Sequence, residues 1–390
     1  MPRPDPLVAR MRGFGTTIFA EMSALALVTD SVNLGQGFPD TDGPPEILAA
    51  AIDAMRSGQN QYPPGPGIPA LRHAIAEHQQ RCYGLDYDPD AEVLVTAGAT
   101  EAIAAAVLAL AGPGDEVVLF EPYYDSYAAC VALGGATRRT VTIERAGAGW
   151  GFDPAALERA ITPATKLILL NSPHNPTGTV FGPAELAVIA DAAIRHDLVV
   201  VSDEVYEHLT FDGHRHVPIA TLPGMRERTV TISSAGKTFS VTGWKIGWAC
   251  APLPLLAAVR TVKQFLTYVN GAPFQPAVAQ VLATAEKLAP ADALQAQRDL
   301  LCDGLAERGY DVIRPQATYF ATVDVGTDAV AFCRDLPRRA GVVAIPSSVF
   351  YDSDAGDHFV RFAFCKRPDV LVDALRRLTD GQLTGEGDVP

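Results

Sequence analysis

Lysine is scarce in this chain of 390 residues, because only six of its 31 basic residues are lysines, at positions 166, 237, 245, 263, 287 and 366. Two of the six, Lys237 and Lys245, nevertheless lie in one short run, SSAGKTFSVTGWKIGW, between two segments that we expect to be buried strands. The letters GKT resemble the end of a phosphate-binding P-loop, but that motif needs a glycine where this chain has Thr231. The lysine pair therefore requires another explanation.

Cysteine pairs are also lacking. The six cysteines are far apart and form no C-x-x-C pair, which argues against a disulfide framework or a zinc site and predicts reduced thiols in a cytosol. His214-x-His216 offers two histidines without a third ligand, so we read them as solvated and predict no metal. The cysteines are Cys82, Cys130, Cys250, Cys302, Cys333 and Cys365.

The chain also lacks an excess of positive charge and long apolar runs. The net charge is -14, and no Lys/Arg run is interleaved with aromatic residues, which argues against nucleic-acid binding. The longest apolar run, Ala102–Ala111, is too short to span a bilayer, and the N-terminus has no apolar signal-peptide segment. With 48% apolar and 19% charged residues, the composition predicts a well-packed cytoplasmic enzyme without membrane partners.

The middle of the chain alternates short β-branched runs with longer alanine-rich segments of helical period. Such alternation predicts an α/β fold, in which helices cover both faces of a mostly parallel sheet. The predicted strands are Glu92–Thr96, Glu116–Glu121, Lys166–Asn171, Leu198–Asp203, Thr229–Ser233 and Lys245–Ala251. The predicted helices are Glu101–Ala111, Tyr124–Leu133, Pro154–Ala160 and Pro183–His196.

A different pattern follows the middle of the chain. A helical stretch, Pro276–Arg308, precedes strand-like TYFATVDV and FVRFAFC, which flank a predicted helix at Ala329–Ala340. This predicts a smaller α+β lobe, and the chain of 390 residues is long enough for two lobes. We expect an N-terminal segment (1–40) that joins the small domain, a large domain (41–285), the small domain (286–380) and a flexible tail (381–390).

Polar side chains follow several of the predicted strands. Asp203 ends one apolar strand and is followed by Tyr206, while Asn171 and Asn175 follow another. LVTAGATEAI ends a strand at the start of a helix, an arrangement that offers free N–H groups to an anion. Because ligands gather at the carboxyl ends of parallel strands, we expect these groups and the lysine pair to share one crevice.

The lysine pair fits the chemistry of a Schiff-base cofactor. A nucleophilic lysine must lose its proton, which burial and a neighbouring cation both favour. Lys237 is therefore a candidate imine-forming residue, with Lys245 as a cation able to pair with a phosphate. Asp203 provides the anion that a pyridinium nitrogen requires.

Seven motifs, in order, carry a family resemblance. NLGQGFPD, NQYPPGPG, EPYYDSY, SPHNPTG, SDEVYEHL, SAGKTFSVTGWKIGW and FVRFAFC are similar to those of class I/II aminotransferases, over roughly Phe14 to Leu378. The chain most resembles the branch that holds N-succinyldiaminopimelate, kynurenine, glutamine and methionine aminotransferases. The resemblance implies a fold type I transferase dependent on pyridoxal 5'-phosphate, with a mostly parallel seven-stranded sheet.

The resemblance implies a role for each residue around the cofactor ring. Lys237 would bind the cofactor aldehyde covalently, and Asp203 would pair with the pyridinium nitrogen. Tyr206 and Asn175 would hydrogen-bond the phenolic oxygen, and Tyr124 would stack on the ring. Each residue has an ordinary alternative, since Asp203 could cap a turn and Tyr124 could be a packing aromatic.

A second group would hold the cofactor phosphate. The resemblance assigns Ala99, Thr100, Ser234 and Lys245 to it, together with Tyr62 of a neighbouring subunit. The wider class often has arginine at the Lys245 position. The phosphate here would therefore be bound by a single ammonium charge instead of a planar guanidinium with two parallel donors. The role of Tyr62 implies a homodimer with shared active sites.

The substrate side is implied in the same way. Arg361 would bind the substrate α-carboxylate through two parallel hydrogen bonds, and Gly37, Phe19 and Asn175 would also contact the substrate. Because FVRFAFC places Arg361 in an apolar strand, the alternative of a surface arginine is disfavoured. No metal ligand is implied.

The implied reaction is transamination between an amino acid and 2-oxoglutarate. The favoured donor is N-succinyl-LL-2,6-diaminopimelate, in lysine biosynthesis; the alternative is broad activity on methionine, glutamine or kynurenine, with possible β-lyase side activity. TYVNGAPF, residues 267–274, contains no cation for a short distal carboxylate, and Asn270, Tyr268 or Phe19 would meet a longer arm. Other readings are a lyase or synthase on the same scaffold, a transcriptional regulator, and a binding protein without activity.

Overall fold

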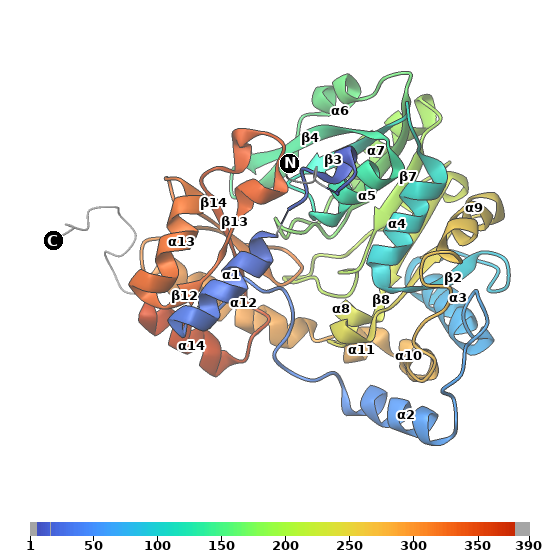
Figure 1. Cartoon of the computed structure of the whole chain (residues 1–390), viewed down its shortest axis with the longest axis horizontal. Helices are drawn as coiled ribbons and strands as arrows, with labels where there is room; N and C mark the ends of the chain where they lie inside the picture. Colours follow the sequence, from blue (N-terminus) through green and yellow to red (C-terminus); the bar gives the residue numbers. More distant parts are fainter. Residues whose placement is uncertain (1–5, 16, 379–390) are drawn as a thin grey trace.

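The computed structural model describes residues 6–15 and 17–378. Two lobes are visible in Figure 1: the large lobe carries the long sheet, and a smaller lobe carries the C-terminal elements. The predicted flexible tail, 381–390, lies outside the described residues. None of the described helices is both long enough and apolar enough to cross a membrane.

The sheet of the large lobe has eight strands. Its spatial order is β2-β9-β8-β7-β6-β3-β4-β5. The strands are β2 (Val93–Ala97), β3 (Glu116–Glu121), β4 (Thr137–Ala146), β5 (Gly149–Phe152), β6 (Thr165–Asn171), β7 (Val199–Asp203), β8 (Thr229–Ser234) and β9 (Ile246–Cys250).

The expectation of a mostly parallel sheet is confirmed, but the count of seven strands is too low. β4, β3, β6, β7 and β8 pair in parallel, whereas β9 is antiparallel to both β8 and β2. The additional strand is β5, which pairs antiparallel with β4 after a tight turn at Gly147, where φ is +60°. A turn of this kind is favoured by glycine and adds an edge strand without a crossover helix.

Both faces of the sheet are buried at its centre, which explains why β3 and β6 are mostly apolar. Along β3, Val117 and Leu119 pack in one core with α4, α5 and α9, while Val118 and Phe120 pack on the opposite face with α6 and α7. The helices are α1 (Ile18–Thr29), α2 (Pro45–Arg56), α3 (Pro69–Tyr83), α4 (Gly98–Leu110), α5 (Ser126–Gly134), α6 (Pro154–Ala160), α7 (Pro183–Arg195), α8 (Ala235–Thr238), α9 (Leu253–Lys263), α10 (Phe274–Leu282), α11 (Ala285–Leu288), α12 (Ala291–Ala306), α13 (Ala329–Ala340) and α14 (Pro368–Arg377).

The small lobe is built on an antiparallel sheet of order β10-β11-β14-β13. Its strands are β10 (Asp311–Ile313), β11 (Phe320–Asp324), β13 (Ile345–Pro346) and β14 (Phe359–Ala363). β1 (Val32–Asn33) pairs in parallel with β12 (Val342–Val343), and α1 lies beside α13 (Figure 1). On these contacts we propose the domain limits near residues 40 and 285.

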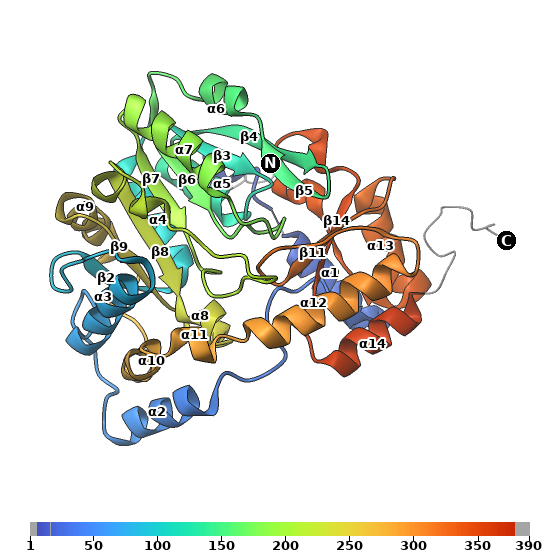
Figure 2. The ribbon, with the colours of Figure 1, turned by 180° about the vertical axis from the view of Figure 1, so that it is seen from behind.

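The helical stretch expected over 276–308 is divided. α10 ends at Leu282, α11 is a single turn, and α12 begins only after Pro290. Proline has no N–H to continue a helix, which gives the break a physical reason. In Figure 2, α12 runs from α11 toward α14 and connects the two lobes. Short 3₁₀ helices cover Ala9–Met11, Ile219–Thr221, Arg226–Arg228, Thr242–Trp244, Ser347–Phe350 and Asp354–Gly356.

Candidate active site

A cavity of about 380 Å³ opens at the carboxyl ends of β6, β7 and β8. β9 is antiparallel to β8, so the residue that precedes β9 reaches the edge at which β8 ends. The cavity thus collects residues from strand ends, from the start of α4 and from the small lobe. Of the thirteen predicted site residues, twelve line it: Phe19, Gly37, Ala99, Thr100, Tyr124, Asn175, Asp203, Tyr206, Ser234, Lys237, Lys245 and Arg361.

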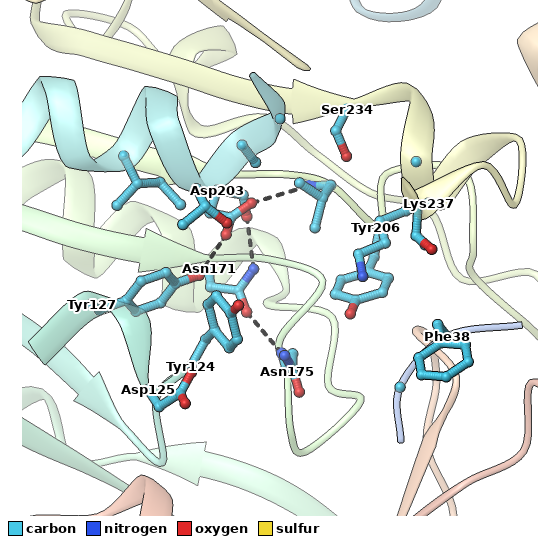
Figure 3. A pocket seen from close by; sticks show the side chains of 18 of the residues that line it. Phe38, Tyr124, Asp125, Tyr127, Asn171, Asn175, Asp203, Tyr206, Ser234 and Lys237 are labelled. Carbon is cyan, nitrogen blue, oxygen red and sulfur yellow. Dashed lines mark hydrogen bonds between the residues drawn. The ribbon is translucent and has the colours of Figure 1, made fainter. Parts of the chain in front are cut away.

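Asp203 lies at the bottom of the cavity and is held by its neighbours. The hydroxyl of Tyr127 donates a hydrogen bond of 2.6 Å to Oδ2 of Asp203, and the side-chain amide of Asn171 donates one of 2.8 Å to its carbonyl (Figure 3). Burial raises the pKa of Asp203 to about 6, while the bond from Tyr127 opposes the rise. The carboxyl group is therefore ionised at neutral pH, and a cationic ring nitrogen beside it would favour this form further.

Lys237 is held by the small lobe. Its Nζ donates a hydrogen bond of 2.6 Å to the hydroxyl of Tyr319, which in turn donates one of 2.7 Å to the carbonyl of Gly37. Burial lowers the pKa of Lys237 to about 8, and the cations Lys245 and Arg361 contribute to the decrease. A lowered pKa makes the neutral amine, which is the nucleophilic form, accessible near neutral pH.

The start of α4 forms an anion cradle that depends on two glycines. Gly98 has φ +74°, and a Cβ on it would lie 3.1 Å from Nζ of Lys245. A Cβ on Gly247 of β9 would come within 2.5 Å of the carbonyl carbon of Gly98. The first N–H groups of a helix have no partner within the helix. The site therefore combines these donors with a nearby ammonium group.

Asn270 supports this cradle and does not extend the substrate pocket. Its side-chain amide donates hydrogen bonds of 2.9 Å to the carbonyl of Lys245 and 3.1 Å to that of Thr96. Neither Asn270 nor Tyr268 is among the residues that line the cavity. Of the three side chains that were expected to meet a long substrate arm, only Phe19 lies in it.

Arg361 is buried within a ring of aromatic side chains. It projects from β14 and is 2% exposed. Its guanidinium carbon lies 3.9 Å from the ring centre of Phe320, 4.8 Å from that of Phe350 and 5.3 Å from that of Phe19. Nη1 donates to Oδ1 of Asn175 at 3.1 Å, whereas Nε has no partner among the described residues. The arginine is thus fixed in orientation with donor capacity left for a ligand.

Two further aromatic side chains lie around the cavity. Tyr206 is buried, and its ring meets that of Tyr319 edge-on at 5.2 Å. Tyr124 precedes α5, in a loop and not inside the helix that was expected there. Burial raises the pKa of both hydroxyl groups. Both remain protonated and can donate a hydrogen bond.

Three residues of the site were not assigned by the sequence. Tyr127 holds Asp203, Tyr319 holds Lys237, and Asp125 places a carboxyl group on the cavity wall beside Tyr124 (Figure 3). Burial raises the pKa of Asp125. Tyr127 and Asp125 belong to the motif EPYYDSY and Tyr319 to TYFATVDV. The motifs were recognised, but their pairings depend on contacts between distant segments.

Two sequence expectations fall outside the cavity. Tyr62 does not line it; its side chain is 82% exposed, and its ring lies 5.6 Å from that of Tyr268. The reading of His216 as a solvated histidine is wrong. It is buried and lies 2.8 Å from a carboxylate oxygen of Glu204, the residue that follows β7, whereas His214 is exposed.

Comparison with known proteins agrees with this geometry. The model of the family "Aminotransferase class I and II" matches residues 29–378. The "Probable N-succinyldiaminopimelate aminotransferase DapC" of Mycobacterium tuberculosis is 55% identical, over 95% of this chain and 98% of its own. The methionine aminotransferase of Escherichia coli is 40% identical, over 96% and 98%. A solved structure of the Mycobacterium tuberculosis N-succinyldiaminopimelate aminotransferase superposes with a TM-score of 0.93, at 56% identity, covering 95% of this chain and 99% of that one.

Proposed function

The chain belongs to the class I and class II aminotransferases, and we propose that it transfers the amino group of N-succinyl-LL-2,6-diaminopimelate to 2-oxoglutarate. It is a fold type I aminotransferase that uses pyridoxal 5'-phosphate. The observation that carries the donor is the 55% identity, over nearly the whole chain, to the protein named for this substrate.

The cavity fits the cofactor. Gly247 lets β9 pack directly against the start of α4, and Gly98 leaves room for the ammonium group of Lys245 beside the first N–H groups of that helix, where a phosphate would bind. Lys237 supplies the amine that an aldehyde requires, and Asp203 supplies the anion for a ring nitrogen. When bound, pyridoxal phosphate supplies an electron sink that makes the Cα–H of an amino acid acidic.

We assign proton transfer to Lys237. Its Nζ is the basic group in the cavity whose pKa, about 8, lies near neutrality, and a base of this kind contributes about 10²–10⁴-fold to a rate. Tyr319 orients the amine before substrate arrives. We assign binding of the substrate α-carboxylate to Arg361 and assign Tyr206 and Asn175 to the phenolic oxygen of the cofactor.

The cavity also supports the choice of donor. The lysines and arginine among its described lining residues are Lys237, Lys245 and Arg361, and each already has an assigned role. A short distal carboxylate, such as that of aspartate, would therefore lack a cation and would meet Asp125 as a like charge. A long arm would pass Asp125 and lie against Phe19 and other apolar lining residues. Those apolar residues also make methionine or kynurenine the second candidate donor.

We propose that the working unit is a homodimer in which Tyr62 reaches the partner's phosphate site. Tyr62 is highly exposed, as are Phe265, Leu266 and Tyr268, and the ring of Tyr268 lies 5.6 Å from that of Tyr62; this exposure supports the proposal. An exposed aromatic and aliphatic surface of this kind is typical of an interface. A cytoplasmic location stays a prediction.

Donor kinetics test the proposal. kcat/KM should be measured with 2-oxoglutarate for N-succinyl-LL-2,6-diaminopimelate, methionine, glutamine, kynurenine and aspartate, with Lys237→Ala as the inactive control. We expect the succinylated donor to have the highest value and aspartate the lowest. A tenfold preference for methionine or kynurenine would overturn the assigned donor but leave the aminotransferase family unchanged.

A further inference from the structure

A group of metal-binding side chains lies outside the catalytic cavity. His78 and Cys82 occupy adjacent turns of α3, and His208 lies in the loop that follows β7. We call these three residues the His–Cys cluster. The two imidazole nitrogens and the thiol sulfur all lie within 4.8 Å of one another, and none of the three residues lines the catalytic cavity.

The geometry of the cluster brings the ligand atoms to one point. His78 and Cys82 are four residues apart, so their side chains share one face of the helix. Nε2 of His78 lies 2.7 Å from Nε2 of His208, with the rings nearly perpendicular at 78°. His78 is fully buried, whereas Cys82 is partly exposed and gives the site a path to solvent.

Two carboxylates place negative charge beside the cluster. An oxygen of Glu207 lies 4.0 Å from Nε2 of His208, and Glu207 is itself held by hydrogen bonds from Tyr83 and Ser233. Cys82 donates to Oε1 of Glu286 at 2.8 Å. Arg81 pairs with Glu286 at 3.1 Å, so Glu207 is the carboxylate that would balance the charge of a dication. Carboxylates hydrogen-bonded around a site commonly fix the first ligands in place.

We propose that His78, Cys82 and His208 bind a zinc ion. Two imidazoles and one thiolate are a ligand set that zinc prefers over harder cations such as calcium and magnesium. Three protein ligands leave one tetrahedral position, which a water molecule fills. The sequence analysis predicted no metal. For this site, our proposal replaces that prediction.

To accept the ion, the imidazoles must move apart and the thiol of Cys82 must turn from Glu286 toward them. Zinc–nitrogen distances of 2.0–2.1 Å in a tetrahedral site separate two nitrogens by roughly 3.3 Å, so the imidazoles must move apart by about half an ångström. His208 lies in a loop, where such a shift is inexpensive. Without the ion the imidazoles hydrogen-bond each other and the thiol bonds Glu286. The cluster residues therefore have hydrogen-bond partners when no ion is bound.

A bound zinc would connect the large lobe's outer helix to the catalytic loop. α3 belongs to the core that packs with α2 and α10, whereas His208 lies two residues after Tyr206, which lines the catalytic cavity. The ion would hold this loop against α3 and reduce local opening there. Zinc at this position would stabilise the contact between the loop and α3, independent of the amino donor.

The test measures zinc retained by the purified holoenzyme. Wild type, Cys82→Ala, His208→Ala and the control Cys130→Ala are treated with a chelator, exposed to zinc, desalted and analysed for metal per chain. Cys130 is a matched thiol on α5, outside the cluster. Wild type and the control should retain one zinc per chain, and both cluster variants should lose it. Thermal unfolding without zinc verifies that every variant is folded.

Thermal unfolding with zinc provides a second measurement. Ligands that bind only the folded state raise its stability, so zinc should raise the Tm of the wild type and control by a few degrees and leave the Tm of Cys82→Ala unchanged. Absence of stoichiometric zinc from the wild type, or retention at the wild-type level by either cluster variant, overturns the proposal. Aminotransferase activity does not enter this test.

Discussion

Replacement of Arg361 by lysine tests the assigned carboxylate site. The wild-type guanidinium is 2% exposed, is surrounded by the rings of Phe19, Phe320 and Phe350, and donates to Asn175. Lysine keeps a positive charge but loses the planar pair of donors that matches a carboxylate. Substrate capture should therefore weaken while cofactor binding stays unchanged.

The magnitude follows from the number of bonds that are lost. A hydrogen bond to a charged group contributes about 1.5–3 kcal/mol, and lysine retains one such bond of the bidentate pair. At 1.36 kcal/mol for each factor of ten, loss of the other bond lowers kcat/KM by roughly 10- to 150-fold. Burial lowers the pKa of Arg361 only to about 10, so the native residue stays charged at neutral pH. A buried lysine would lose charge more readily, which adds to the decrease.

The assay separates substrate capture from cofactor binding. kcat/KM is measured for the succinylated donor, and cofactor occupancy is measured from the visible absorbance of the same preparation. Arg367→Lys is the matched control, because its side chain is 57% exposed and its ion pair with Asp40 is 3.9 Å long. Exposed pairs of this kind contribute about 0–1 kcal/mol, so this control should keep wild-type kinetics. An unchanged kcat/KM in Arg361→Lys, with the cofactor bound, would refute the assignment.

Three further predictions concern the lysine and the dimer. Borohydride should attach the cofactor to Lys237 and not to Lys245, as read by peptide mapping; because burial lowers the Lys237 pKa from 10.5 to about 8, the neutral amine forms as pH rises through that value. The rate of cofactor rebinding to cofactor-free enzyme should then level off above about pH 8, and a rise that continues toward 10.5 would contradict the shift. Mixed dimers of Lys237→Ala and Tyr62→Ala should regain activity over either parent, since one of their sites keeps both residues; verified hybrids without such a gain would count against shared sites.

Local sequence determined the main sheet and the positions of its polar strand ends. Strands buried on both faces are rich in apolar and β-branched residues, so β3, β6, β7 and β8 were predictable within a residue or two. Functional residues of such sheets lie at the carboxyl ends of the strands. The positions of Asp203 and Lys237 just after predicted strands therefore placed both residues in one crevice. β4 was not predicted, because its run TRRTVTIERA is largely polar and partly exposed.

The tertiary structure alone decided which of these groups touch. Tyr319 meets Lys237 across 82 residues, Tyr127 meets Asp203 across 76, and Arg361 meets Asn175 across 186. The His–Cys cluster likewise joins α3 to a loop 130 residues later. A local sequence pattern indicates periodicity and burial, because both depend on neighbouring residues in the chain. Contacts between segments far apart in the sequence depend on how the packed layers meet, and no short stretch of sequence contains that information.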